Sequence, residues 1–354
     1  MAAISRLNPE HTFWGLGGDH MIKEGLNPLF HVRDLGVTGF VEVIKHLSFF
    51  RTVMSRVVNE VIANKPNAAI LIDYPGFNLR LGLKLKALGV PVYYYISPQV
   101  WAWKKNRIKV MRQFIKRIFV IFPFELDFYS EQNIPVSFAG HPLVDKMFNL
   151  PEKSAFFRQY GLDAEKPLLA LLPGSRRNEL SRHSRPLIDA VKLLRDKHSD
   201  LQVVLAGVST LENSYYESFK EIAGLVLIHD DPYPLISFAN VAIVASGTAS
   251  LETAYLGTPL LVIYRVSPLS YLIGKLLIKI DHLAMPNLIL GERAIPELIQ
   301  RDANPRTIAG QTTRLLSDSN DRRQMLEKLK KLKTSLGKSG CANKIATQIL
   351  TELG

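Results

Sequence analysis

Two segments in the second half of the chain share one order: an apolar run, a Gly/Ser turn and a stretch of helical period. They are residues 168–179 and residues 241–252. Each apolar run is expected to be a buried parallel strand, and each turn presents the unpaired N–H groups that begin the next helix. Ligands of parallel α/β sheets bind beyond the carboxyl ends of the strands. Two such turns in one sheet therefore predict a site for a nucleotide diphosphate.

The side chains in these turns fit the same ligand. The guanidinium of Arg176 is a fixed fork of donors that suits phosphate oxygens. Glu252 follows the second turn by about one helical turn, where its carboxylate can accept hydrogen bonds from a ribose diol. Taken alone, each motif describes an ordinary structural turn equally well; together they favour a sugar-nucleotide site. The predicted diphosphate contacts are Gly174, Ser175, Arg176, Ser246, Gly247 and Thr248.

The rest of the pattern predicts an α/β protein of two doubly wound, Rossmann-like domains facing a cleft, because short Val/Ile/Tyr-rich runs alternate with helical segments. A length of 354 residues with 47% hydrophobic content supplies two cores. We place the domains at residues 1–150 and 151–354, with a hinge near residues 150–166 and a helical tail over residues 305–353. The chain opens with a helix at residues 2–7, so the first strand of the N-terminal domain is expected to be missing. Strands are expected at residues 69–72, 92–96, 118–122, 168–172, 202–206, 226–228, 242–245 and 260–264.

The net charge of +12 and the pI near 9.6 call for an anionic partner: nucleic acid, an acidic membrane surface or a phosphorylated substrate. A single cysteine, Cys341, excludes an internal disulfide and favours the cytoplasm. No apolar run approaches the roughly 20 residues of a membrane-spanning helix, so any membrane contact is expected to be peripheral. The histidines and carboxylates show no metal-ligand spacing, so we expect no metal and no cofactor.

Asp73 is the candidate general base. It ends an expected strand at the start of Asp73-Tyr-Pro-Gly-Phe-Asn78. An apolar setting beside Tyr74 and Phe77 is expected to raise its pKa toward a useful value for taking a proton from a sugar hydroxyl. Asp before Pro-Gly is also a common turn former, and that alternative stays open.

Three regions combine apolar or aromatic bulk with positive charge, as lipid-facing segments do. In the first, Trp101 and Trp103 precede a basic stretch over residues 104–117; its interleaved apolar residues disfavour nucleic-acid binding. The second, residues 37–50, contains Phe40 and Ile44. The third is residues 264–280, where a core helix is an equal alternative. His141 near the hinge contacts either a phosphate or only its own loop. The possible acceptor or lipid contacts are Phe40, Ile44, Trp101, Trp103 and His141.

Nine motifs through nearly the whole chain together resemble the lipid-A-disaccharide synthases, inverting glycosyltransferases of the GT-B fold. They are Gly15-Leu-Gly-Gly-Asp-His-Met21, Asp73-Tyr-Pro-Gly-Phe-Asn78, Ser97-Pro-Gln-Val-Trp-Ala-Trp103, Pro123-Phe-Glu125, Gly140-His-Pro-Leu143, Leu172-Pro-Gly-Ser-Arg176 with Glu179, Ser246-Gly-Thr-Ala-Ser-Leu-Glu252, Tyr264-Arg265 and Pro286-Asn-Leu-Ile289.

The resemblance implies transfer of the sugar of UDP-2,3-diacylglucosamine to 2,3-diacylglucosamine 1-phosphate, giving UDP and the β-1,6-linked lipid A disaccharide 1-phosphate, without a metal. It implies Asp73 as the base, the two turns as diphosphate binders, Glu252 as a ribose ligand and Asn287 as a further UDP contact. It also implies an enzyme on the inner face of a Gram-negative inner membrane.

Other functions remain open at this stage. The expected loss of a strand allows a catalytically silent sugar-nucleotide or lipid-binding fragment of the same fold. The two turns alone also fit a sugar-nucleotide epimerase, although the aromatic motif at residues 97–103 argues against that activity. A nucleic-acid binder is a distant third, and the sequence does not indicate an oligomeric state.

Overall fold

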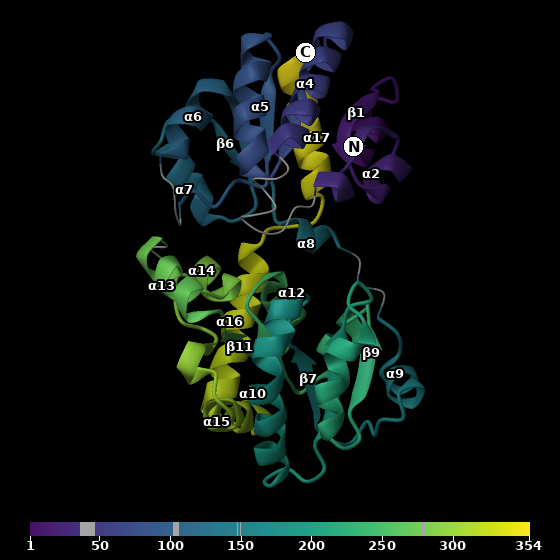
Figure 1. The fold of residues 1–354 in the computed structure, drawn as a ribbon, viewed down its shortest axis with the longest axis vertical. Coiled ribbons are helices and arrows are strands. Elements are labelled where there is room, and N and C mark those ends of the chain that lie inside the picture. Colours follow the sequence, from purple (N-terminus) through teal and green to yellow (C-terminus); the bar gives the residue numbers. More distant parts are fainter. Residues whose placement is uncertain (36–46, 102–105, 147, 149, 278–279) are drawn as a thin grey trace. The chain divides into compact units, whose positions relative to one another are not determined.

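The computed structural model describes residues 1–35, 47–101, 106–146, 148, 150–277 and 280–354. The chain forms two compact units (Figure 1). The first unit consists of Met1–Asp145 and Leu336–Gly354, and the second of Lys146–Ser335. The second unit carries the two motifs of residues 168–179 and 241–252, so its sheet decides how those motifs lie.

The second unit is built on a six-stranded parallel sheet of order β12-β11-β10-β7-β8-β9. Every residue of β7 and β10 is buried, as expected for strands that are covered on both faces. All five strands that the sequence predicts here are present, whereas β12 was not predicted. The strands are β7 (Leu168–Leu172), β8 (Gln202–Gly207), β9 (Val226–His229), β10 (Val241–Ala245), β11 (Leu260–Tyr264) and β12 (Glu297–Ile299).

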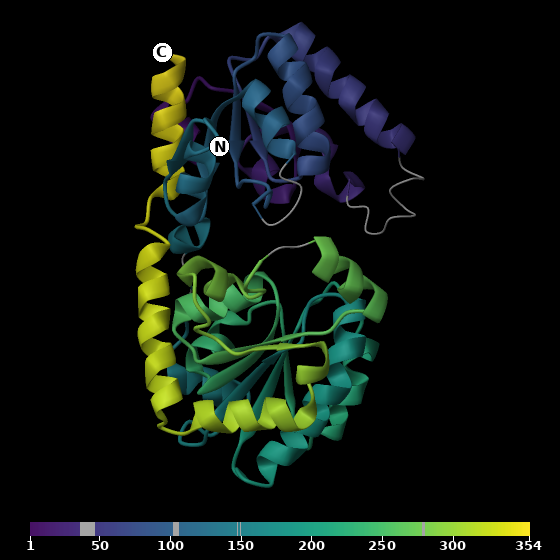
Figure 2. The same ribbon diagram turned by 90° about the vertical axis from the view of Figure 1, so that its left-hand side faces the viewer.

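Helices cover this sheet, and the long α16 runs along one side of the unit in yellow (Figure 2). Helix α10 packs against α15, and α12 packs against α14 and α16. The expected helical character of residues 305–353 is confirmed by α15, α16 and α17. The helices of this unit are α9 (Lys153–Gln159), α10 (Arg177–Arg195), η2 (Asn213–Glu221), α11 (Tyr233–Phe238), α12 (Thr248–Leu256), α13 (Pro268–Leu277), α14 (Met285–Leu290), η3 (Gln300–Asp302), α15 (Pro305–Leu316) and α16 (Asn320–Ser335).

The first unit contains a four-stranded parallel sheet of order β3-β4-β5-β6 and a separate two-stranded parallel sheet, β1-β2. In the described residues this four-stranded sheet begins at β3, as an edge strand, and the chain opens with a helix as expected. The strands are β1 (Phe13–Gly17), β2 (Leu26–His31), β3 (Ala69–Ile72), β4 (Val92–Tyr95), β5 (Ile115–Val120) and β6 (Val136–Phe138). The helices are α1 (Ala2–Leu7), α2 (Asp19–Lys23), η1 (Val32–Leu35), α4 (Leu47–Asn64), α5 (Pro75–Ala87), α6 (Arg107–Phe114), α7 (Phe124–Ser130), α8 (Pro142–Asp145) and α17 (Cys341–Leu353).

The last helix joins the first unit, whereas the sequence analysis grouped the whole tail with the second domain. Ile345 and Ile349 of α17 pack with Tyr93 and Phe119 of the four-stranded sheet. Ala346 packs with the buried residues of α1. The apolar face of α17 therefore completes a core that residues 1–145 leave open. No described helix has the length and apolar character needed to cross a membrane.

Candidate nucleotide and acceptor sites

The turn after β7 and the turn after β10 lie side by side, because β7 and β10 are hydrogen-bonded neighbours in a parallel sheet. Gly174, Ser175 and Arg176 follow β7 and lead into α10. Ser246 and Gly247 follow β10 and lead into α12. The six residues that the sequence assigned to the diphosphate thus gather at one edge of one sheet.

The turn before α10 is filled by a side chain of its own helix. The Oε2 atom of Glu179 accepts hydrogen bonds from the backbone N–H of Ser175 at 3.0 Å and of Arg176 at 3.3 Å. A Cβ added at Gly174, whose φ is +115°, would lie 2.3 Å from the same oxygen. The expectation of unpaired N–H groups is therefore wrong for Ser175 and Arg176, since a carboxylate already caps them. The Arg176 side chain itself is 79% exposed and touches Glu179 only at 3.4 Å.

The turn before α12 is open. Gly247 has a φ of +149° and is exposed together with Thr248. Within the described ranges, no acceptor is found for the backbone N–H groups of Thr248 and Ala249, which precede the first hydrogen bond of the helix. Such groups and the positive end of the helix dipole favour an anion at this position. Of the two predicted anion cradles, the N-terminus of α12 is the one whose N–H groups have no partner among the described residues.

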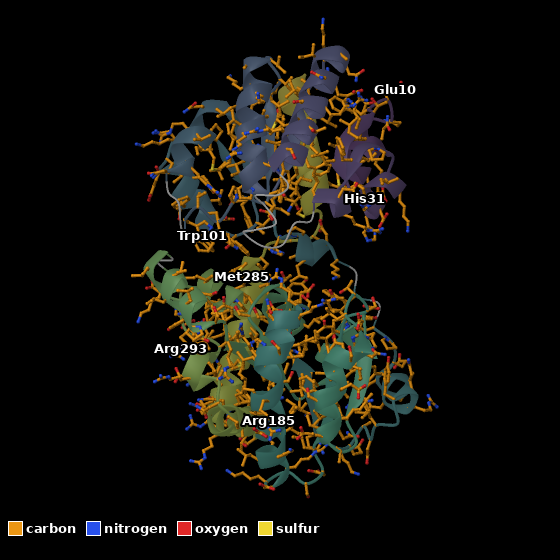
Figure 3. The ribbon with its side chains drawn as sticks, viewed as in Figure 1. Glu10, His31, Trp101, Arg185, Met285 and Arg293 are labelled. Carbon is orange, nitrogen blue, oxygen red and sulfur yellow. The ribbon has the colours of Figure 1, made fainter. Side chains whose placement is uncertain are left out.

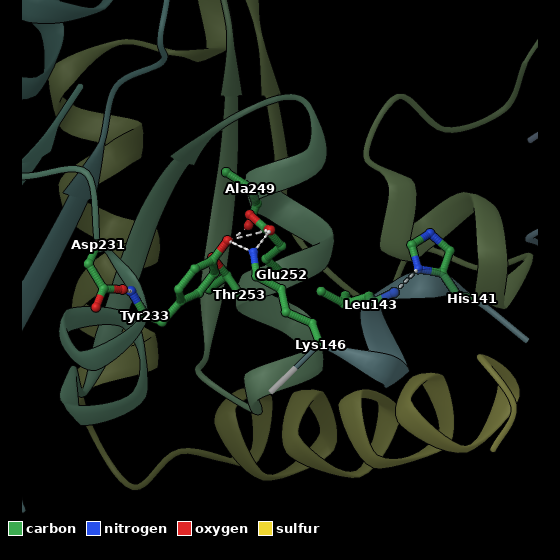
Figure 4. A network of polar contacts seen from close by, with 8 residues as sticks. All are labelled: His141, Leu143, Lys146, Asp231, Tyr233, Ala249, Glu252 and Thr253. Carbon is green, nitrogen blue, oxygen red and sulfur yellow. Dashed lines mark hydrogen bonds and ion pairs between the residues drawn. The ribbon is translucent and has the colours of Figure 1, made fainter. Parts of the chain in front are cut away.

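Glu252 is held in a polar network one helical turn from that cradle (Figure 4). The hydroxyl of Tyr233 donates to Glu252 Oε1 at 2.7 Å, and Lys146 Nζ lies 3.3 Å from the same oxygen. Lys146 also contacts the Tyr233 hydroxyl and lies 4.0 Å from the centre of its ring. Burial opposes the charge of Lys146, but the contacts with Tyr233 and Glu252 outweigh it and raise the Lys146 pKa. The carboxylate that the sequence assigned to ribose is thus fixed by two residues that the sequence analysis missed.

Asn287 has no exposed surface, and its amide is fully used inside the protein. Its Nδ2 donates to the Ile295 carbonyl at 2.9 Å and to Glu297 Oε1 at 2.7 Å. Its Oδ1 accepts from the N–H groups of Ala294 and Ile295, both at 2.8 Å. Four hydrogen bonds exhaust what one amide can usefully make in this setting. In the structure Asn287 ties α14 to the segment before β12.

The motifs of the first half follow consecutive strands of the four-stranded sheet. Asp73 follows β3, Ser97 and Trp101 follow β4, Glu125 follows β5, and His141 follows β6. Because the four strands are parallel, all these loops leave the same edge. The spacing of the motifs along the chain therefore becomes one row of loops in space.

Asp73 is exposed just after β3, and the described residues of the first unit form no apolar enclosure around its carboxylate. Its φ of +43° and the +45° of Tyr74 place two successive non-glycine residues in the left-handed region, a conformation that costs about 1–3 kcal/mol at each residue. Asn78 Nδ2 donates to the Asp73 carbonyl at 2.8 Å and to the Ile72 carbonyl at 3.1 Å. The hydroxyl of Tyr94 donates to the same Asp73 carbonyl. These bonds hold the strained turn that projects Asp73 from the sheet edge.

Glu125 organises the loop after β4, a role that the sequence analysis did not assign. It is 1% exposed and accepts hydrogen bonds from Trp101 Nε1 at 3.2 Å, from the Phe122 N–H at 3.1 Å and from Ser97 Oγ. Burial raises the Glu125 pKa against the lowering effect of these donors. The position of Trp101 in this loop is labelled in Figure 3. Trp101 is thus anchored by its ring nitrogen.

His141 is half-buried and engaged with its own loop. Its Nδ1 accepts from the Leu143 N–H at 3.0 Å, and its ring stacks on Phe122 with centroids 5.5 Å apart. Burial lowers the pKa of His141 to about 4, so the ring is neutral at pH 7. The loop contact is therefore the one that the structure shows. Phe40, Ile44 and Trp103 lie outside the described residues, and so does most of the segment 37–50.

Comparison with known proteins agrees with this arrangement. The family model of lipid-A-disaccharide synthetase matches residues 2–351. The chain belongs to this family. Lipid-A-disaccharide synthase of Geobacter metallireducens is 37% identical over 99% of the chain and 91% of the relative. That of Syntrophus aciditrophicus is 39% identical over 99% of the chain and 92% of the relative. The chain is accordingly a glycosyltransferase that forms the lipid A disaccharide, and the silent fragment is not favoured.

Solved structures share the fold. The UDP-GlcNAc 2-epimerase of Neisseria meningitidis, bound to UDP-GlcNAc, matches with a TM-score of 0.63 and 12% identity, over 96% of this chain and all of that one. UGT71G1 of Medicago truncatula, complexed with UDP-glucose, matches with a TM-score of 0.60 and 13% identity, over 99% of this chain and 93% of that one. The predicted fold class, two Rossmann-like α/β domains as in GT-B glycosyltransferases, is confirmed. In the described part of the chain, no group of three or more His, Cys, Asp or Glu side chains is arranged to hold a metal ion.

Proposed function

We propose that the enzyme transfers the sugar of UDP-2,3-diacylglucosamine to the 6-hydroxyl of 2,3-diacylglucosamine 1-phosphate by a single inverting displacement. The carboxylate of Asp73 takes the proton of the hydroxyl while its oxygen bonds to C1 of the donor sugar. The bond from C1 to the diphosphate breaks, and UDP leaves with the electron pair. The products are the β-1,6-linked disaccharide 1-phosphate and UDP.

The observation that carries this proposal is the open N-terminus of α12 beside the turn that bears Arg176. The developing charge of the leaving diphosphate is stabilised by the free N–H groups of Thr248 and Ala249 and by the exposed guanidinium of Arg176. Glu252, oriented by Tyr233 and Lys146, accepts hydrogen bonds from the ribose hydroxyls. Glu179 and Asn287 shape the surrounding loops from within the protein.

Replacing Asp73 by asparagine tests the assignment of the base. The shape of the turn is kept, because the bonds from Asn78 and Tyr94 go to the backbone carbonyl of residue 73. We expect UDP release in the presence of acceptor to fall by about 10²–10⁴-fold, the usual share of a general base. The dissociation constant of UDP should change less than threefold. Asp127→Asn, at an exposed site on α7, is the matched control. An equal loss of turnover and of UDP affinity in Asp73→Asn would mean that Asp73 is structural.

We further propose that the enzyme works at an anionic membrane surface, on the cytoplasmic face of the inner membrane, with α13 as one contact. Leu269, Leu272 and Leu276 recur at the spacing of one helix face and are 68%, 56% and 71% exposed. Lys275 is exposed beside them, and residues 264–280 include no acidic residue. An apolar face with sparse positive charge fits the boundary between lipid head groups and acyl chains. The lipid chains of both substrates begin at that boundary.

Sedimentation with lipid vesicles tests this contact. The fraction of protein bound to vesicles containing phosphatidylglycerol should fall at least fivefold in the double variant Leu272→Ser, Leu276→Ser, because two apolar side chains no longer leave water. Leu193→Ser, at an exposed site on α10, should bind vesicles as the unaltered protein does. UDP affinity should be the same in all three proteins. Equal vesicle binding by the double variant and the control would exclude α13 as a membrane contact.

A further inference from the structure

His183 is a buried histidine of α10 whose two ring nitrogens are both used. It is 1% exposed. Its Nδ1 lies 2.7 Å from the carbonyl oxygen of Pro173, and its Nε2 lies 3.2 Å from the backbone nitrogen of Arg265. A carbonyl only accepts and an N–H only donates, so Nδ1 carries the proton and Nε2 accepts. The ring is therefore neutral and fixed in one tautomer.

These two hydrogen bonds join the loops that follow two different strands of the sheet. Pro173 follows β7 and precedes Gly174, while Arg265 follows β11. In the sheet order β11-β10-β7, the strand between them is β10, which leads into the open N-terminus of α12. One imidazole thus connects the backbones on both sides of the anion cradle.

The residues on either side of His183 are suited to a diphosphate. Arg176 lies three residues after Pro173, with its guanidinium exposed. Arg265 is half-buried, and its guanidinium has no hydrogen-bond or ion-pair partner in the described part of the chain. The distance between the backbones at Pro173 and Arg265 limits the distance between the guanidinium groups of Arg176 and Arg265.

We propose that His183 is a positioning residue for the nucleotide diphosphate, holding the Pro173–Arg176 turn and the Arg265 backbone at a fixed spacing so that Arg176 and Arg265 flank the N-terminus of α12. Arg265 is then a second cation for the diphosphate. The inference rests on the proposed function, because it takes UDP as the ligand of this edge.

Loss of the ring leaves the buried Pro173 carbonyl and the part-buried Arg265 N–H without partners, and the two segments are then free to separate. Acid has a related effect. Burial lowers the pKa of His183; Glu179 nearby favours the charged ring, whereas Arg265 and Arg182 oppose it. Once protonated, Nε2 donates and no longer accepts from the Arg265 N–H. The hydrogen bond from the Arg265 N–H is therefore lost only when the pH falls through the lowered pKa of His183, which lies below the ordinary histidine value near 6.5.

Three substitutions distinguish the hydrogen bond to the Pro173 carbonyl from the hydrogen bond to the Arg265 N–H. His183→Asn places an amide nitrogen near the position of Nδ1 and keeps the bond to the Pro173 carbonyl. His183→Gln places an amide oxygen near the position of Nε2 and keeps an acceptor for the Arg265 N–H. His183→Leu removes both. His198→Gln, beyond the far end of α10, is the control.

UDP affinity by calorimetry, and the KM and kcat for the donor, are the readouts at pH 7.5. We expect His183→Leu to raise the dissociation constant of UDP and the donor KM at least tenfold, while kcat at saturating donor changes less than threefold. This combination indicates the loss of an interaction that the enzyme makes equally with the bound donor and with the transition state. The Asn and Gln variants should lie between the Leu variant and the unaltered protein. Between pH 7.5 and pH 5, UDP affinity should fall more in the unaltered protein than in His183→Gln, whose amide does not titrate.

The outcomes distinguish this inference from the proposed function. If the unaltered chain binds no UDP, the proposed function fails. If it binds UDP and folded His183→Leu binds UDP equally well, the positioning role is wrong and the proposed function stands. Should His183→Leu fail to fold, the Asn and Gln variants decide: unchanged UDP affinity in both, or parallel pH profiles in His183→Gln and the unaltered protein, overturns the inference.

Discussion

Replacing Asn287 by alanine separates a ligand contact from an internal tie. The substitution removes four hydrogen bonds, to Ala294 N–H, Ile295 N–H, Ile295 carbonyl and Glu297 Oε1. Each buried group left without a partner costs about 1–3 kcal/mol. Glu297 keeps its hydrogen bonds from the N–H groups of Leu283 and Ala284, so it contributes little to the loss of stability. Water that enters the vacated space can hydrogen-bond some of the three backbone groups that lose their partner. The net loss in the free energy of unfolding is then about 3–5 kcal/mol.

A loss of that size is large compared with the usual stability of a domain. At roughly 2–4 °C for each kcal/mol in a domain of this size, Asn287→Ala should lower the melting temperature by about 6–20 °C. Thermal and urea unfolding, followed by circular dichroism, measure the change. Asn320→Ala, at an exposed position at the start of α16, should stay within about 0.5 kcal/mol of the unaltered protein.

UDP titration of the same variants completes the test. At a temperature where Asn287→Ala is folded, its UDP dissociation constant should lie within threefold of the unaltered value. The reasoning would be refuted by a variant that melts normally but binds UDP at least tenfold more weakly. That result would return Asn287 to the role of ligand that the sequence motif suggested.

Two further changes test the loops at the sheet edges. His141→Asn keeps an acceptor for the Leu143 N–H but does not titrate. The pKa of His141 is near 4 in the folded state and near 6.5 in the unfolded state, so the unaltered protein loses up to about 3 kcal/mol of stability as the pH falls between those values. The variant should lose less stability over the same range. Equal losses in urea unfolding from pH 7 to pH 4 would contradict this expectation. Gly174→Ala should destabilise the protein more than Gly247→Ala, because a Cβ at residue 174 would meet Glu179, whereas nothing lies within 4 Å of a Cβ at residue 247. The reverse order in urea unfolding would count against the capping of the residue 174–176 turn by Glu179.

The sequence predicted the second sheet well because its strands are continuous apolar runs between clear turns. β12 was missed because three residues beginning with Glu297 have no such pattern. β5 begins at Ile115, three residues before the prediction, since Lys116 and Arg117 look like the end of a basic helix. Short β6 gave too weak a signal for the same reason as β12.

The candidate sites were predicted at the level of loops and less well at the level of atoms. The motif after β7 indicated free N–H groups, but no pattern shows that Glu179 folds back to cap them. The Pro286-Asn motif suggested a UDP contact at Asn287, but it did not indicate the burial and the four internal hydrogen bonds that the structure adds. The contacts of His183 join segments 82 residues apart, a separation at which periodicity carries no information.

The placement of α17 affects how the protein is made. Its apolar face packs on Tyr93 and Phe119, so the first unit contains residues from both ends of the sequence. Domains usually fold in the order in which the ribosome delivers them, beginning with the N-terminal one. Here the second unit is fully synthesised while the first still lacks Leu336–Gly354. The nascent first unit therefore waits with part of its core uncovered, and the growing chain is most exposed to aggregation and to chaperones at that stage.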